Sequence, residues 1–194
     1  MADHSTKFGM VGGGQGAFIG DVHRLAARLD GQIELVCGAF SRDAENCQAT
    51  GQQLGLDPAR CYPDYHDMMR AEAALPADER MDFVAIVTPN HMHFPVAEAA
   101  LKTGFHVLSD KPATLDLEEA VALKSLVAET GKTYGLTHTY LGYPLVSAAR
   151  EIVAEGGIGK VRKVFVEYIQ GWLASEVDNK QADWRAAPTR SGIS

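Results

Sequence analysis

Residues 7–20 read Lys7-Phe8-Gly9-Met10-Val11-Gly12-Gly13-Gly14-Gln15-Gly16-Ala17-Phe18-Ile19-Gly20, the pattern of a strand, a glycine turn and a helix. A short apolar run ends at Gly12, and a helical pattern begins directly after Ala17. The order Gly12, Gly14, Ala17 is the G-x-G-x-x-G/A spacing that opens a strand–turn–helix unit for a dinucleotide. Gly12 is expected to allow the tight turn, Gly14 to let the backbone approach a pyrophosphate, and Ala17 to let the helix pack on the strand. Backbone N–H groups and the positive end of the helix dipole would then face the phosphates.

The composition is that of a globular protein with a substantial core. The chain has 194 residues, 46% of them hydrophobic and 22% charged, which is enough for one full domain and part of another. A net charge of -7 argues against a general nucleic-acid surface, which needs a basic excess.

The cysteines and the termini of the chain predict a reducing compartment. Cys37, Cys47 and Cys61 are odd in number and lack C-x-x-C spacing, so we expect free thiols and not disulfides or zinc ligands. The first six residues lack the apolar core of a signal peptide, and no later run reaches membrane-spanning length. We therefore expect a cytoplasmic protein with no membrane partner.

Strand and helix patterns alternate along the first 140 residues, which predicts an α/β fold with a doubly wound parallel sheet of the Rossmann type. Strands are expected after the first one at Ile33–Phe40, Phe83–Val87, Phe105–Leu108 and Thr133–Thr137. Helices are expected at Phe18–Leu29, from Ser41 to about Leu54, and at Pro63–Ala74, Pro95–Lys102 and Asp116–Thr130. We assign residues 1–140 to a dinucleotide-binding domain.

The remaining residues, 141–194, change in character and are expected to begin an α+β substrate domain. The pattern predicts a helix at Pro144–Glu155 and a long strand at Val161–Gln170. One helix and one strand are too few for an independent core, so this second domain is expected to be incomplete.

Three polar segments follow predicted strands, namely Ser41-Arg42, Thr88–His93 and Asp110-Lys111-Pro112. In an open parallel sheet the ligand lies beyond the carboxyl ends of the strands, so these segments are candidates for one site. Each has a plainer alternative: a simple turn for the second segment and a solvated lysine for the third. His91 and His93 lack further ligands at suitable spacing, so no metal is expected.

The end of the second strand bears on the choice of cofactor. An acidic residue there would bind the ribose hydroxyls of NAD, whereas Ser41-Arg42 suits the 2′-phosphate of NADP. Asp43 is close and can also begin the next helix. We favour NADP and leave NAD open.

The ordered motifs resemble the glucose-fructose oxidoreductase / inositol 2-dehydrogenase / MocA family of NAD(P)-dependent sugar oxidoreductases. The resemblance covers essentially the whole chain. The matching pieces are Val11–Ala17, Thr88–His93, Asp110-Lys111-Pro112, Glu155–Val161 and Trp184-Arg185.

The resemblance implies that Lys111 is catalytic, lying beside the nicotinamide and hydrogen-bonding the substrate oxygen. The Lys-Pro bond of the family is often cis, so the resemblance implies that the Lys111–Pro112 bond can be cis as well. Asp110 replaces the glutamate of the family motif.

The motifs and the resemblance together predict a set of binding residues. Those expected to bind the cofactor are Gly12, Gly14, Gln15, Gly16, Ala17, Phe18, Ser41, Arg42, Thr88, Pro89, Asn90, His93, Asp110, Lys111, Trp184 and Arg185. Those expected to line the sugar pocket are Lys111, Tyr140 and Trp172. Core packing is the alternative for both aromatic residues, and a surface Trp-Arg pair is the alternative for Trp184-Arg185.

The resemblance implies hydride transfer between nicotinamide and a sugar, polyol or related cyclic alcohol. It also implies a homo-oligomer, a dimer or tetramer, in the full-length protein. The family's catalytic Asp-x-x-x-His segment would come soon after Ile193, and we expect the 194-residue chain to be inactive by itself. The alternatives are a non-catalytic dinucleotide sensor, or a glycosidase that reduces and reoxidises bound NAD within one cycle.

Overall fold

The computed structural model describes residues 5–169, 171, 174–175, 185 and 187–192. The chain divides into two compact units, Met1–Thr137 with Ala187–Ser194, and His138–Ala186. Trp172, predicted to line the sugar pocket, and Trp184, predicted to bind the cofactor, lie outside the described residues.

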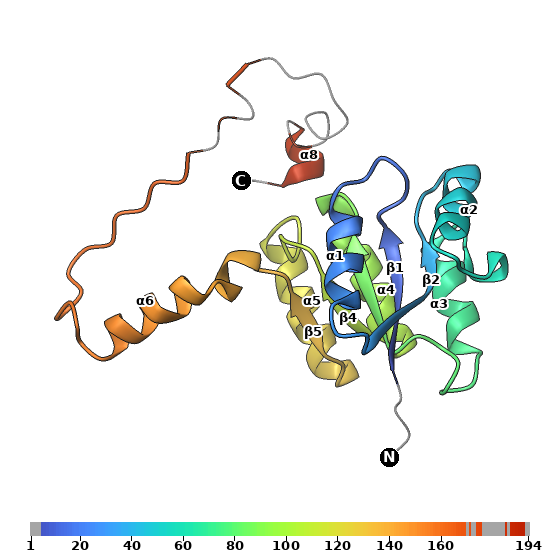
Figure 1. The fold of residues 1–194 in the computed structure, drawn as a ribbon, viewed down its shortest axis with the longest axis horizontal. Helices are drawn as coiled ribbons and strands as arrows, with labels where there is room; N and C mark the ends of the chain where they lie inside the picture. Colours follow the sequence, from blue (N-terminus) through green and yellow to red (C-terminus); the bar gives the residue numbers. More distant parts are fainter. Residues whose placement is uncertain (1–4, 170, 172–173, 176–184, 186, 193–194) are drawn as a thin grey trace. The chain divides into compact units, whose positions relative to one another are not determined.

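The first unit is built on a parallel sheet of five strands in the order β2-β1-β3-β4-β5 (Figure 1). The strands are β1 (Thr6–Gly12), β2 (Ile33–Ala39), β3 (Phe83–Val87), β4 (His106–Ser109) and β5 (Tyr134–Leu136). The chain runs from β1 outward to β2 and then crosses to β3 on the other side of β1. This reversal is the switch point of a Rossmann sheet, which confirms the predicted fold.

Helices connect the strands close to the predicted positions. They are α1 (Ile19–Arg28), α2 (Ala44–Gln53), α3 (Tyr65–Ala73), α4 (His93–Thr103) and α5 (Leu117–Thr130), with short 3-10 turns η1 (Pro58–Arg60) and η2 (Asn90–Met92). Asp116 caps the start of α5 by accepting from Glu119 N–H, and Gly131 ends it with a left-handed backbone. The N-cap aspartate and the C-cap glycine therefore determine the two ends of α5.

The sheet separates two hydrophobic cores, and the alternation within β3 shows the division. Val84 and Ile86 pack in one cluster with α4 residues, whereas Ala85 and Val87 belong to the cluster that Ile19 and Ala27 of α1 pack against. Successive strand side chains point to opposite faces, so a run of apolar residues is buried on both sides.

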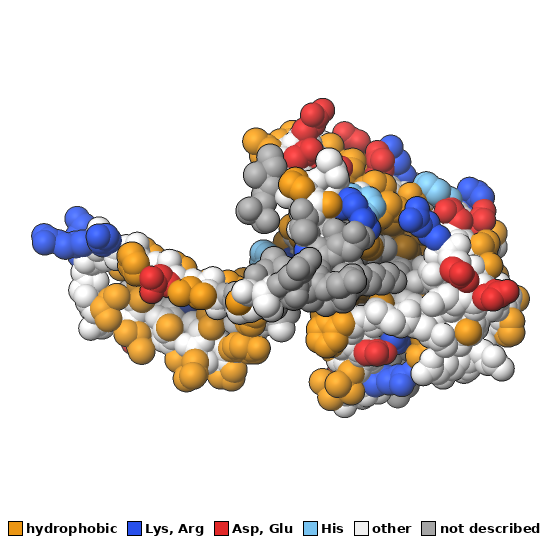
Figure 2. Space-filling view, turned by 90° about the horizontal axis from the view of Figure 1, so that it is seen from above, with side chains coloured by type: hydrophobic (Ala, Val, Ile, Leu, Met, Phe, Trp, Pro, Cys, Tyr) orange, Lys and Arg blue, Asp and Glu red, His pale blue; other side chains and the backbone are white. Residues whose placement is uncertain are grey.

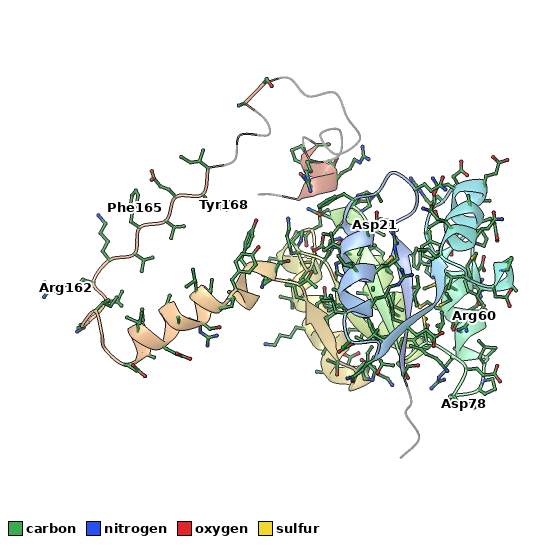
Figure 3. All side chains as sticks on the ribbon, viewed as in Figure 1. Asp21, Arg60, Asp78, Arg162, Phe165 and Tyr168 are labelled. Carbon is green, nitrogen blue, oxygen red and sulfur yellow. The ribbon has the colours of Figure 1, made fainter. Side chains whose placement is uncertain are left out.

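A buried carboxylate fastens α3 to the segment before it. Glu72 is fully buried and pairs with Arg60, whose Nε donates to Oε1 at 3.0 Å (Arg60 is labelled in Figure 3). The hydroxyl of Tyr62 and the backbone N–H of Met81 also donate to it, both at 3.1 Å. These contacts satisfy the charge, as a buried carboxylate requires.

The contact that places α1 is between two glycines. A Cβ on Gly20 would lie 2.6 Å from the Cα of Gly13. The close approach falls at Gly20, within α1, whereas Ala17, the residue predicted for this packing, lies before the helix begins.

This contact determines which side of α1 faces the sheet. Gly20 and Arg24 are buried, whereas Val22, Leu25 and Leu29 are 44%, 66% and 81% exposed. The helical spacing of the apolar residues predicted the helix correctly but does not mark its buried face.

The second unit contains η3 (Thr139–Gly142) and α6 (Pro144–Ala154), close to the predicted helix. Many of its apolar side chains are exposed (Figure 2). The predicted strand at Val161–Gln170 is not found over residues 161–169, and Gln170 lies outside the described residues. A strand requires a neighbouring strand to pair with, and residues 161–169 form no strand pairing with the described part of the chain.

Two further features complete the fold. A four-residue helix, α8 (Pro188–Ser191), belongs with the first unit and contacts η2. None of the helices in the described part of the chain has the length and apolarity needed to cross a membrane.

Replacing Gly20 by alanine tests the glycine contact. Helix propensity alone would stabilise the protein by about 0.5–1 kcal/mol, but overpacking against Gly13 costs about 1–3 kcal/mol. We expect Gly20→Ala to lower the free energy of unfolding measured in urea. An increase in stability would contradict the contact.

Candidate functional site

Four loops follow the carboxyl ends of β1, β2, β3 and β4, and they carry most of the predicted site residues. Because these strands are parallel, their ends meet at the same edge of the sheet. The loops are residues 13–18, 40–43, 88–92 and 110–116. The structure therefore brings together the three polar segments and the glycine loop, by which we mean residues 13–18.

Gly12 and Gly14 are both required by the structure, for different reasons. Gly12 has φ 87°, and a Cβ there would lie 2.9 Å from the carbonyl oxygen of Val87, so its predicted turn role is confirmed. The N–H of Gly14 donates to the carbonyl of Phe40 at 3.1 Å, and a Cβ on Gly14 would lie 2.5 Å from Asn46 Oδ1. The space beside Gly14 is thus filled by this chain.

The later part of the glycine loop leaves donors open at the start of α1. The N–H of Ala17 donates to the carbonyl of Gly14 at 2.9 Å. Those of Gly16 and Phe18 have no partner among the described residues, and a Cβ on Gly16 would meet no atom within 4 Å. Open N–H groups at a helix N-terminus are suited to phosphate oxygens.

Arg24 lies beneath the glycine loop and was not identified from the sequence. Its Nη1 donates to the carbonyl of Gly13 at 3.0 Å, and its Nη2 pairs with Asp21, which Figure 3 labels on α1. Arg24 is only 7% exposed. The sequence shows Asp21 and Arg24 three residues apart on a helix, but not that this side of the helix faces inward.

The turn after β2 leaves a guanidinium available at the sheet edge. Asp43 caps α2 by accepting from the N–H of Asn46 at 2.9 Å, and its own N–H donates to Ser41 Oγ at 3.1 Å. Arg42 is exposed and forms no ion pair within the described part of the chain. The acidic residue is therefore engaged as a helix cap.

His93 connects the loop after β3 to the loop after β4. It is fully buried, with Nδ1 2.5 Å from the carbonyl oxygen of Pro112 and Nε2 2.9 Å from that of Thr88. Both ring nitrogens thus face backbone carbonyls. Asn90 donates from Nδ2 to the carbonyl of Ser191 at 2.7 Å.

Two buried polar atoms in the loop after β3 lack a partner among the described residues, Thr88 Oγ1 and His91 Nδ1. A buried polar atom without a hydrogen bond costs about 1–3 kcal/mol. A bound ligand at this edge would have polar atoms to satisfy there.

Lys111 and Asp110 follow β4. Lys111 is exposed, and the Lys111–Pro112 bond is cis, as the resemblance implies. Asp110 Oδ1 accepts from the hydroxyl of Thr137 at 3.0 Å. Burial lowers the pKa of His23, and the nearby Asp110 carboxylate opposes that shift. His23 is thus a titratable group within electrostatic reach of Asp110 that was not predicted from the sequence.

Two of the predicted site residues, Tyr140 and Arg185, belong to the second unit. In the second unit, Tyr140 lies with its hydroxyl 2.9 Å from that of Tyr168, and this hydrogen bond raises the pKa of Tyr140. Arg185 is exposed.

The three cysteines are free and buried, and no group of metal-binding side chains occurs among the described residues.

The sequence model of a family described as the oxidoreductase family with an NAD-binding Rossmann fold, GFO/IDH/MocA, matches residues 6–138. This chain belongs to that family. The match confirms the resemblance read from the motifs, and it extends over more than half of the chain.

Relatives and solved structures agree with this assignment to GFO/IDH/MocA. The chain is 34% identical over 192 residues to the uncharacterized oxidoreductase YfiI of Bacillus subtilis, covering 97% of this chain and 48% of the relative. An inositol dehydrogenase homolog from Azotobacter vinelandii in complex with NAD+ superposes with a TM-score of 0.91 at 38% identity, covering 97% of this chain and 49% of that one. A structure of an inositol dehydrogenase homolog from the same organism with NADH and myo-inositol gives a TM-score of 0.77 at 40% identity, covering 82% and 41%. The chain spans about half the length of the curated relatives it matches.

Replacing Arg24 by methionine tests the support beneath the glycine loop of this GFO/IDH/MocA chain. Arg24→Met keeps an apolar stem but leaves the Gly13 carbonyl without its donor, so we expect the free energy of unfolding to fall by about 1–3 kcal/mol. Arg28→Met, at an exposed position in the last turn of α1, is the matched control and should change stability by less than about 0.5 kcal/mol. Equal effects of the two substitutions would contradict the role of Arg24.

Proposed function

We propose that this chain is the cofactor-binding part of an NAD(P)-dependent oxidoreductase that acts on a sugar, polyol or related cyclic alcohol. The observation that carries the proposal is the placement of the open helix N-terminus after β1 and the Lys111 turn after β4 at one edge of the same sheet. The similarity to an inositol dehydrogenase homolog solved with NADH and myo-inositol supports this substrate class.

The residues present fit a dinucleotide. The open N–H groups of Gly16 and Phe18 would hold the pyrophosphate, and the Ser41-Arg42 turn would hold the adenosine ribose. Thr88, with its unpartnered buried hydroxyl, and Asn90 would lie on the nicotinamide side. The nicotinamide, when bound, supplies hydride chemistry at its C4 atom.

Lys111 would be the catalytic residue of the chain. Its ammonium would donate a hydrogen bond to the substrate oxygen and favour the negative charge that develops there as the C–H bond breaks. Asp110 and His93 would act indirectly, because Asp110 is held by Thr137 and His93 joins the turn of Lys111 to the loop after β3.

We further propose that proton transfer needs a histidine that these residues do not supply, so that the chain alone binds cofactor without turnover. The family resemblance supports this part of the proposal, as it does the expectation of a homo-oligomer for the longer protein.

Substitution of Lys111 tests the proposed function. In a protein extended to the length of its relatives, Lys111→Met should lower kcat/KM with a polyol by about 10²–10³-fold and change the Kd for NADH by less than about threefold. Lys124→Met, at an exposed position on α5, is the control and should leave both unchanged.

The 194-residue chain provides the complementary measurement. We expect it to bind NADH or NADPH, followed by nicotinamide fluorescence, and to show no absorbance change at the nicotinamide band with a panel of sugars and inositols. Turnover by this chain would contradict the proposed need for a further histidine. Absence of any cofactor binding would contradict the proposed function.

Arg42 is proposed to favour NADP over NAD, since Asp43 is engaged as a cap and Arg42 has no ion pair in the described residues. A charge-assisted hydrogen bond is worth about 1.5–3 kcal/mol, so Arg42→Gln should weaken NADPH binding by roughly 10- to 100-fold. NADH binding should change by less than about twofold. Arg28→Gln serves as the control, and equal losses for NADPH and NADH would contradict the preference.

A further inference from the structure

Two side chains of α2 hold the backbone of the glycine loop at Gln15. The N–H of Gln15 donates to Asn46 Oδ1 at 3.2 Å and to Thr50 Oγ1 at 3.1 Å. Asn46 Nδ2 donates back to the carbonyl oxygen of Gln15 at 3.4 Å. Both backbone polar groups of Gln15 are therefore bound by one helix.

The direction of these hydrogen bonds is set within α2. Thr50 is 4% exposed, and its hydroxyl donates to the carbonyl of Asn46 at 2.7 Å, which leaves its lone pairs to accept from Gln15. Asn46 Oδ1 occupies the space that a Cβ on Gly14 would take. A side chain at position 14 would therefore displace Asn46 Oδ1 from the position in which it accepts from Gln15.

Asn46 also connects two parts of the edge that the proposed function assigns to different ends of the cofactor. Its side chain binds the glycine loop, while its backbone N–H donates to Asp43, the residue after Ser41-Arg42. The phosphate side and the adenosine side of the site are therefore joined through a single residue of α2.

We propose that Asn46 and Thr50 are positioning residues that hold the glycine loop in its pyrophosphate-binding conformation before the dinucleotide arrives. The inference rests on the proposed function, in which this loop receives the pyrophosphate. Ordering a loop residue costs about 1–2 kcal/mol, and a loop already ordered does not subtract that cost from binding. The N–H of Gln15 belongs to this support, and the open N–H groups of Gly16 and Phe18 are left for the phosphates.

The test compares ligands with and without a diphosphate on the 194-residue chain. NADH, ADP and adenosine are titrated against the wild type, Asn46→Ala, Thr50→Val and Thr50→Ser. We expect Asn46→Ala and Thr50→Val each to weaken NADH and ADP binding by roughly three- to tenfold, as the loss of a hydrogen bond predicts. Adenosine binding should change by less than about twofold. Thr50→Ser keeps the hydroxyl and should bind ADP like the wild type.

Gln48→Ala is the matched control on the same helix. Gln48 Nε2 donates to the carbonyls of Pro58 and Cys61 at 3.3 and 3.0 Å, away from the glycine loop. Its replacement should lower stability without changing ADP affinity. If Asn46→Ala does not fold, the comparison of Thr50→Val with Thr50→Ser decides the question.

The outcomes separate the inference from the function on which it rests. A wild-type chain that binds neither NADH nor ADP overturns the proposed function, and the inference with it. A wild-type chain that binds both, with variants whose affinities are unchanged or fall equally for adenosine and ADP, overturns the positioning role alone.

Discussion

The close contact between Gly13 and Gly20 positions α1 against the sheet and so shapes the candidate site. It places the first turn of α1 directly against the loop after β1, so the helix N-terminus opens at the carboxyl edge of the sheet. It also turns Arg24 inward, where its guanidinium holds the carbonyl of Gly13. A larger side chain at either glycine would move the helix, and the open N–H groups would no longer face this edge.

Side chains from several elements hold the loops around that contact through hydrogen bonds to backbone atoms. Arg24 holds the glycine loop from α1, Asn46 and Thr50 hold it from α2, and His93 joins the loops after β3 and β4. A site on loops requires such support, because unsupported loop residues lose conformational freedom when a ligand binds. Under the proposed function, these hydrogen bonds order the edge before the cofactor arrives, and Lys111 lies exposed at the same edge.

Local patterns predicted the fold and the segments of the site, because these depend on residues near one another in the sequence. Apolar runs such as Phe83–Val87 predicted the strands, and capping residues such as Asp116 and Gly131 predicted the helix ends. The parallel order of the strands then brought the predicted segments to one edge. The strand predicted at Val161–Gln170 is not found over residues 161–169. A strand depends on a second strand that is distant in the sequence, and a local pattern does not reveal that second strand.

The residues that hold the glycine loop could not be predicted from the sequence, because their roles arise only from packing. Arg24, Asn46 and Thr50 have ordinary side chains for a helix surface, and only the rotation of α1 and α2 against the sheet turns them toward the glycine loop. The approach of Gly14 to a pyrophosphate stays a prediction, and the nearest atoms to a side chain placed there belong to Phe40 and Asn46.

A crystal structure of this chain with NADPH or NADH would show where the cofactor binds. We expect the pyrophosphate on the N–H groups of Gly16 and Phe18 at the start of α1, with the nicotinamide ring beside the ammonium of Lys111. A cofactor bound elsewhere, or a nicotinamide ring far from a lysine that points into solvent, would contradict it.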